Sequence, residues 1–159
     1  MARVQTASME DYLEAVAILQ NDKRHPVRVS QISKALGVKM PSVTSAVRKL
    51  SKEGLVKHES YGYVELTSEG DEIAKDVIRR HDTLRRFFVE ILNMDADVAS
   101  EDACRMEHSL SPTALERLSK FVEFALSCPR GEPEWLKNYN YYLVHGIHSA
   151  ECLSGCECE

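Results

Sequence analysis

The triplet Cys104, Glu107 and His108 has the residue types and the spacing of a metal site. In a helix, positions i, i+3 and i+4 share one face, so a thiolate, a carboxylate and an imidazole would lie together. This donor set suits a divalent metal such as Fe, Mn, Co or Zn. An ordinary helix surface can carry the same triplet, so the spacing alone leaves both interpretations open.

Three more candidate ligands come from earlier segments. His81 lies in the apolar stripe of a long predicted helix and would point into a domain. Asp11 and Glu14 are i, i+3 neighbours in the first predicted helix and add two carboxylates. Each has an ordinary alternative, because a single histidine is often a hydrogen-bonded core residue and paired acids often form a solvated face.

Soft ligands gather again near the C-terminus. The pattern H-x-x-H-x-x-x-C-x-x-x-C-x-C begins at His145, and an earlier loop adds a further thiol. The cysteines of this candidate second metal site are Cys128, Cys152, Cys156 and Cys158. Their spacing leaves three interpretations: a closed tetrahedral Zn(II) site, an iron–sulfur cluster, or a tail with exposed thiols.

The charge of the chain is strongly uneven. Between Lys23 and Lys57 there are nine Lys or Arg residues and one acid, whereas from Glu90 onward there are five bases and thirteen acids. Clustered cations attract phosphates and release counterions, so the basic block favours a polyanion-binding face. A solvated basic face is the alternative.

The basic block coincides with a predicted helix-turn-helix. Ser30 suits the N-cap of a short helix that ends at Gly37, and Pro41 suits the first turn of the next helix. The apolar face of that second helix is formed by Val43, Ala46, Val47 and Leu50. Two short helices joined in this way form a DNA-binding motif.

The opposite face of the second helix would enter the major groove of DNA. Base contacts are expected near its N-terminal end, from Lys39, Met40, Ser42 and Ser45, with Pro41 and Thr44 on the same face. Phosphate contacts are expected from Arg28, Lys34, Arg48 and Lys49. After Gly54 two short strands form a wing, where Tyr61 and Tyr63 are further candidates. A winged helix used for protein contacts alone is the alternative.

The rest of the chain reads as helices. Thr67 suits the cap of a long helix to about Ile91, and shorter helices are expected over 103–110, 112–125 and 135–143. The 159 residues suffice for a core, and 43% apolar with 28% charged residues is ordinary. No apolar run approaches the roughly 20 residues of a membrane span. With no secretion signal and five cysteines, we expect a cytoplasmic protein with no membrane partner.

Several motifs in the right order and spacing resemble the diphtheria-toxin-repressor and manganese-transport-regulator family. They are Met9–Glu14, Pro41–Thr44, Gly54–Val56, Leu66-Thr67 with Gly70, Arg80-His81 and Cys104–Ser111. The resemblance covers roughly residues 7 to 127. It implies a homodimeric, metal-activated repressor with a winged helix and a helical dimerisation domain. The remaining residues leave no room for an SH3-like third domain, as in the shorter manganese-regulator architecture.

By the same resemblance, the metal ligands fall on Asp11, Glu14, His81, Cys104, Glu107 and His108. The set is a hybrid, because manganese-type members resemble it at Asp11 and Glu14 whereas iron-type members have the cysteine. Ser100 and Arg85 stand where the ancillary site of the iron type has a His and a Glu. A thiolate ligand such as Cys104 favours Fe(II), Co(II) or Zn(II), whereas carboxylate ligands favour Mn(II). We expect Fe(II) first and Mn(II) next.

The sequence therefore predicts a mainly α protein with three parts. These are a winged helix-turn-helix over 1–70, an all-helical metal-binding and dimerisation domain over 71–144, and a Cys-rich tail over 145–159. The predicted function is metal-dependent repression of metal-homeostasis genes through double-stranded operator DNA, as a homodimer. The alternative is a winged-helix regulator that senses a small ligand, redox state or an iron–sulfur cluster through its cysteines. A metalloenzyme is disfavoured, because no nucleophile motif or phosphate loop is present, and no organic substrate is expected.

Overall fold

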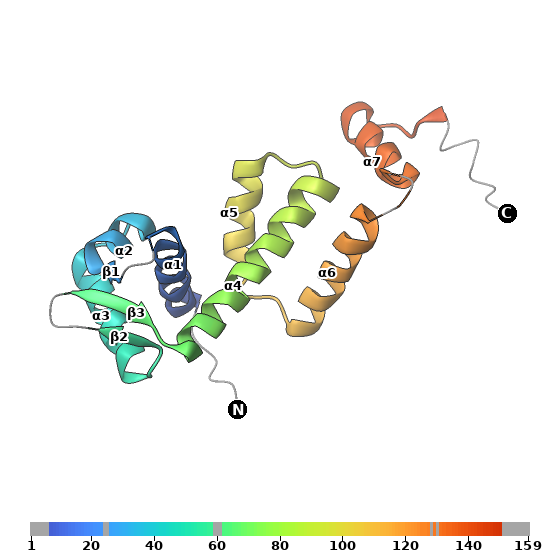
Figure 1. The fold of residues 1–159 in the computed structure, drawn as a ribbon. Coiled ribbons are helices and arrows are strands. Elements are labelled where there is room, and N and C mark those ends of the chain that lie inside the picture. The colour runs from blue at the N-terminus through green and yellow to red at the C-terminus, as the bar shows by residue number, and fades with distance from the viewer. Residues whose placement is uncertain (1–6, 24–25, 59–61, 128, 130, 151–159) are drawn as a thin grey trace. The chain divides into compact units, whose positions relative to one another are not determined.

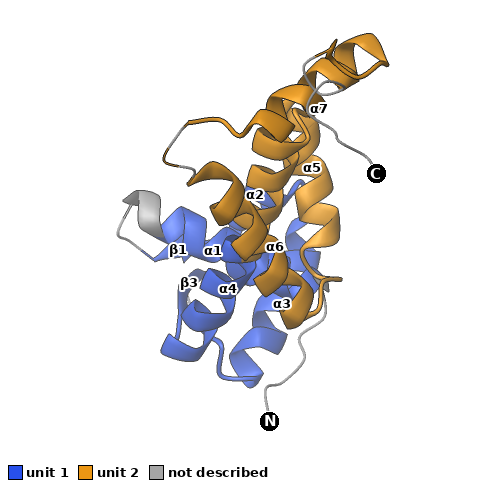
Figure 2. Cartoon of the chain, turned by 90° about the vertical axis from the view of Figure 1, so that its right-hand side faces the viewer, with its two compact units in different colours: residues 1–79 blue, residues 80–159 orange. Residues whose placement is uncertain are grey.

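The computed structural model describes residues 7–23, 26–58, 62–127, 129 and 131–150. The chain divides into two compact units, Met1–Arg79 and Arg80–Glu159 (Figure 2). The boundary falls within helix α4 (Ser68–Arg86), further along the chain than residue 70. The first half of α4 packs on the core of unit 1 through Ile73, Ala74 and Ile78, which is why that unit extends so far.

Unit 1 is a winged helix (Figure 1). Its elements are α1 (Ala7–Lys23), β1 (Val27–Arg28), α2 (Val29–Leu36), α3 (Met40–Lys52), β2 (Val56–His58) and β3 (Tyr63–Leu66). The strands form an antiparallel sheet in the order β1-β3-β2, with Val27 and His58 both opposite Val64. Side chains from α1, α2, α3 and the sheet meet in one core that includes Leu13, Ile32 and Leu50.

The helix-turn-helix forms largely as the sequence predicts. Gly37 ends α2 in the left-handed conformation with φ 65°, which glycine adopts without a steric cost. Pro41 lies in the first turn of α3, where its missing N–H costs nothing. The start of α2 differs, because the helix begins at Val29 rather than after Ser30. Gln31 Oε1 accepts a hydrogen bond of 2.9 Å from the backbone N–H of Arg28 and caps this earlier start.

Thr67 joins the wing to α4. Its Oγ1 accepts a hydrogen bond from the Gly70 N–H at 3.2 Å, as an N-cap does, and donates to the Gly54 carbonyl at 2.8 Å. The predicted cap is therefore confirmed. Gly70 is required here, because a Cβ at this position would collide with the backbone carbonyl of Leu55.

The regular elements among the described residues of unit 2 are all helices. After α4 come a π-helical turn η1 (Phe87–Ile91), α5 (Ala96–Met106), α6 (Pro112–Leu126) and α7 (Glu134–His145). Asp95 caps α5 and Ser111 caps α6 through side-chain oxygens that accept backbone N–H bonds. Its core has one cluster around Leu84, Phe88 and Ala103 and another around Ile91 and Val122. None of the described helices combines the length and apolar character that crossing a membrane requires.

Candidate metal centre and nucleic-acid interface

Glu107 is the one buried charged side chain among the described residues, with an exposed fraction of 0%. It follows α5 directly, and its backbone N–H still donates to the Ala103 carbonyl at 2.9 Å. Removing a carboxylate from water is costly unless charged or hydrogen-bonding partners compensate. The position of Glu107 therefore depends on what surrounds it.

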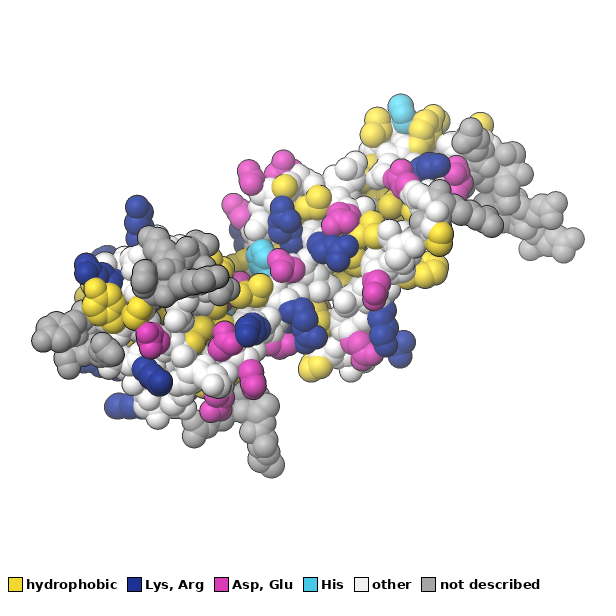
Figure 3. All heavy atoms as spheres, viewed as in Figure 1, with side chains coloured by type: hydrophobic (Ala, Val, Ile, Leu, Met, Phe, Trp, Pro, Cys, Tyr) yellow, Lys and Arg dark blue, Asp and Glu magenta, His cyan; other side chains and the backbone are white. Residues whose placement is uncertain are grey.

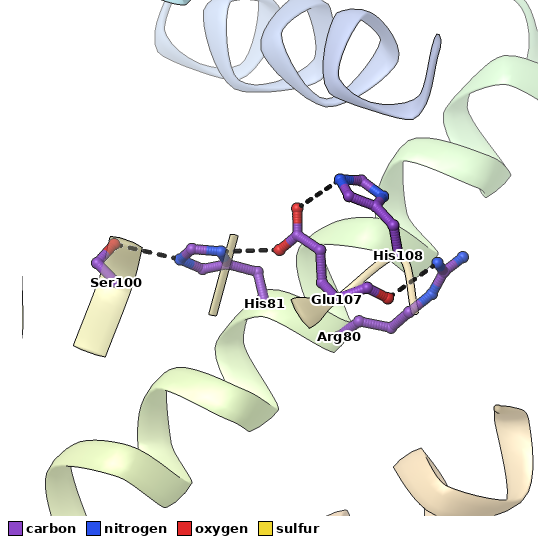
Figure 4. A network of polar contacts seen from close by, with 5 residues as sticks. All are labelled: Arg80, His81, Ser100, Glu107 and His108. Carbon is purple, nitrogen blue, oxygen red and sulfur yellow. Dashed lines mark hydrogen bonds and ion pairs between the residues drawn. The ribbon is translucent and has the colours of Figure 1, made fainter. Parts of the chain in front are cut away.

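Each carboxylate oxygen of Glu107 faces one imidazole (Figure 4). His81 Nδ1, from α4, lies 2.9 Å from Oε2, and His108 Nε2 lies 3.2 Å from Oε1. The two histidine side chains are 21% and 11% exposed, respectively. Two further contacts hold the arrangement: Ser100 Oγ lies 3.4 Å from His81 Nε2, and Arg80 donates to the Glu107 backbone carbonyl at 3.4 Å.

This donor set fits a divalent transition metal. Within unit 2 the Glu107 carboxylate has one imidazole beside each of its oxygens, and oxygen and nitrogen donors of this kind bind Mn(II), Fe(II), Co(II) and Zn(II). A cation there would also neutralise the buried negative charge of Glu107. Burial, charge and ligand chemistry therefore make this place a candidate metal centre.

The other three predicted ligands lie elsewhere in the chain. Asp11 and Glu14 are half-buried on α1 of unit 1, one turn apart and beside the buried Leu13. Cys104 is exposed on α5, which ends at Met106. The helix predicted over 103–110 ends earlier, at Met106, although the Glu107 backbone is still helical and bonded to Ala103. Three of the six predicted ligands meet within one unit.

Some predicted residues lie outside the described part of the chain. These are the wing residue Tyr61 and the four cysteines of the candidate second site, Cys128, Cys152, Cys156 and Cys158. Their predicted roles stay predictions.

The outer face of α3 carries the predicted DNA contacts. Val43, Val47 and Leu50 are buried toward the core, and the opposite side forms a shallow groove. The groove is lined by Met40, Pro41, Thr44, Ser45, Arg48, Lys49 and Lys52. Lys34, Lys39 and Ser42 are exposed as well. The sequence analysis missed Lys52, although its i, i+4 spacing from Arg48 places both cations on one helical face.

Arg28 is held by the wing. Its Nε and one terminal nitrogen donate to the Tyr63 hydroxyl at 3.1 and 2.8 Å, and its guanidinium lies 5.2 Å from the centre of the same ring. The two residues are direct partners across the β1–β3 pair. No pattern predicted this contact, because the two-residue strand β1 is too short to recognise in the sequence. The contact with Tyr63 holds the positively charged Arg28 guanidinium beside the wing.

Unit 2 also carries a large exposed apolar surface on α6 and α7, where Figure 3 shows hydrophobic side chains gathered. Phe124 and Val144 are each 73% exposed, and Phe121, Trp135 and Ile147 are exposed too. Exposed apolar patches of this kind often mark association surfaces.

Two family descriptions match the sequence. Residues 5–64 match "Iron dependent repressor, N-terminal DNA binding domain", and residues 67–136 match "Iron dependent repressor, metal binding and dimerisation domain". An uncharacterized HTH-type transcriptional regulator of Methanocaldococcus jannaschii is 40% identical over 116 residues, which cover 73% of this chain and 93% of that protein. The HTH-type transcriptional regulator MntR of Bacillus subtilis is 37% identical over 119 residues, covering 75% and 82%, respectively.

Solved structures agree with this assignment. The manganese regulator SloR aligns with a TM-score of 0.66 and 31% identity, covering 79% of this chain and 58% of that one. The IdeR of T. acidophilum aligns with a TM-score of 0.67 and 25% identity, covering 82% and 60%. The chain thus spans about three fifths of the length of these two structures.

Proposed function

The chain belongs to the iron-dependent repressor family of metal-dependent transcriptional repressors, and from that premise we propose that a divalent metal held at Glu107 controls its binding to operator DNA. The observation that carries the proposal is the buried Glu107 carboxylate between two imidazoles. In this proposal the face of unit 1 formed by α3 and the Arg28–Tyr63 pair binds the operator DNA.

The metal would join ligands from both units. In this proposal Glu107, His81, His108 and Cys104 of unit 2 and Asp11 and Glu14 of α1 are the ligands. Without a cation, carboxylates brought together repel one another. The bound ion supplies the positive charge that reverses this balance. Metal binding would thereby limit the conformations in which unit 1 can bind DNA.

Fe(II) and Mn(II) are the proposed activating metals. Cys104 distinguishes between them, because a thiolate ligand favours Fe(II) whereas oxygen and nitrogen donors alone suit Mn(II). The relative MntR and the structure of SloR carry names that refer to manganese, whereas the family description refers to iron. Titration of operator binding with each metal would show which of the two activates the protein more strongly.

We propose a homodimer as the DNA-binding form. The matched region includes a dimerisation domain, and α6 within it exposes Phe121 and Phe124. A two-fold dimer would present two α3 helices to successive major grooves, which lie about 34–36 Å apart. An operator with two half-sites at this spacing is therefore expected.

The testing experiment is operator binding by fluorescence anisotropy. Mn(II), Co(II), Zn(II) and anaerobic Fe(II) are titrated separately against a chelated control. We expect tight binding with metal, lost in His108→Ala and kept in Glu101→Ala, a change on the exposed side of α5. Equal binding in chelator and in every metal would reject metal control and leave the sensing of a ligand or oxidant as the function.

A second test uses thermodynamic reciprocity. If metal tightens operator binding, operator must tighten metal binding by the same factor, with a coupling free energy typically of about 1–3 kcal/mol. Metal affinity is therefore measured by calorimetry with and without operator DNA. Identical affinities would show that the two sites are independent.

A further inference from the structure

We propose that the Ser100 hydroxyl is a positioning group for the metal centre, which orients the His81 ring through Nε2 so that Nδ1 faces Glu107. The inference rests on the proposed function. It assigns a role to a residue that, in the sequence, looked like a lost ligand of an ancillary site.

The geometry gives the two ring nitrogens of His81 separate partners (Figure 4). Nδ1 lies 2.9 Å from Glu107 Oε2, and Nε2 lies 3.4 Å from Ser100 Oγ. Ser100 comes from α5 and is half-buried, and His81 comes from α4. The ring is therefore clamped between a charged acceptor and a hydroxyl.

The chemistry of the two partners differs. An ionised carboxylate accepts hydrogen bonds and donates none, so a ring proton on Nδ1 would face an acceptor in Glu107. With the proton there, the lone pair on Nε2 would accept the hydrogen of the Ser100 hydroxyl.

Coordination through Nδ1 requires the opposite tautomer. The Nδ1 lone pair must be available to a metal, so in that form the ring proton is carried on Nε2. The Nε2–H then needs an acceptor, and the Ser100 oxygen provides it after its own hydrogen rotates away. A hydroxyl serves both forms because it donates and accepts. Partners of this kind typically change metal affinity about 10–100-fold when removed.

The first measurement is the affinity of Mn(II) for the full-length protein, by calorimetry. We expect Ser100→Ala to bind Mn(II) about 10–100-fold more weakly, and Ser100→Thr, which keeps the hydroxyl, to bind close to wild type. Ser119→Ala removes an exposed hydroxyl from α6 and is the matched control. Melting of each metal-free variant shows whether the fold is retained.

The second measurement needs no variant. In the Zn(II)-loaded protein with ¹⁵N-labelled histidine, the His81 spectrum should show metal on Nδ1 and a proton on Nε2. Metal on Nε2, or wild-type Mn(II) affinity in Ser100→Ala, would overturn the role of Ser100. Failure of the proposed function looks different, because His81→Ala and His108→Ala would then bind Mn(II) as tightly as wild type.

Discussion

His81 Nδ1 lies 2.9 Å from Oε2 of Glu107, whose side chain is wholly buried. The pair brings together a residue of α4 and the residue that ends α5, 26 positions apart in the sequence. A buried carboxylate in contact with a histidine has two roles at once. It links two helices, and in the proposed function it presents a negative charge to a cation.

Glu107→Gln tests the second role with little change in shape. The amide keeps the volume of the side chain but removes its charge, so we expect metal affinity to fall by more than about a hundredfold, beyond the effect typical of a residue outside the ligand set. Metal-dependent operator binding should be lost with it. Glu101→Gln, on the exposed side of α5, is the control. Retained metal affinity in Glu107→Gln would exclude this carboxylate as a ligand.

Lys52→Gln tests the extension of the DNA-binding face. If Lys52 contacts a phosphate, the slope of log affinity against log salt should decrease by about one, with similar weakening on all DNA sequences. Lys120→Gln removes the same charge from α6. That lysine is a fair match, because its hydrogen bond to Glu116 raises the pKa of Lys120 and keeps it charged. An unchanged slope in Lys52→Gln would place this residue outside the interface.

Tyr63→Phe tests whether the wing positions Arg28. The change removes the hydroxyl that accepts two hydrogen bonds but keeps the ring under the guanidinium. A hydrogen bond contributes about 0.5–1.5 kcal/mol, so we expect operator affinity to fall about 2–10-fold with an unchanged salt slope. Arg28→Ala, in contrast, should lower the slope. Equal affinity of Tyr63→Phe and wild type would show that Arg28 needs no such support.

Cys104→Ser tests the contribution of sulfur. If the exposed thiol completes the site, its replacement by a harder oxygen donor should shift the preference from Fe(II), Co(II) and Zn(II) toward Mn(II). The ratio of Co(II) to Mn(II) affinity is the measurement, with the unchanged Mn(II) response as internal reference. An identical ratio of Co(II) to Mn(II) affinity in the two proteins would exclude Cys104 as a ligand. If oxidation then abolished DNA binding in the wild type but not in Cys104→Ser, Cys104 would be a redox sensor instead.

Gly70→Ala tests the junction between the wing and α4. The added methyl would meet the Leu55 carbonyl, which belongs to rigid backbone, so we expect a loss of about 1–3 kcal/mol in the free energy of unfolding. Glu69→Ala, exposed in the same turn, is the comparison, and chemical denaturation measures both. Equal stability of the two variants would mean that the helix start can shift without cost.

The sequence predicts the elements whose signals are local. Gly37, Pro41 and Thr67 each mark a helix end through a backbone requirement of their own, and each is found where expected. The strand β1 has no such signal, because its two residues become a strand only by pairing with β3. The same limit hides the Arg28–Tyr63 contact.

The candidate site was predictable in residue type and less so in arrangement. Spacing predicted the residue types near one another, but it did not show that Glu107 is wholly buried while Cys104 is exposed. Burial depends on how α5 packs against residues distant in the sequence. The contact between Ser100 and His81 likewise depends on how α5 packs, and spacing does not show it.

The π-helical turn at Phe87–Ile91 limits how this part of the chain can vary. Two adjacent aromatic residues in this turn pack against different neighbours. Phe88 belongs to the cluster beside α5. Phe87 also packs against the cluster that contains Ile91 and contacts Phe121 on α6. A turn of this kind contains one residue more than an α-helical turn. Loss of a single residue would rotate everything after it and separate one aromatic side chain from its cluster. During evolution the segment should therefore accept changes of residue type far more readily than insertions or deletions.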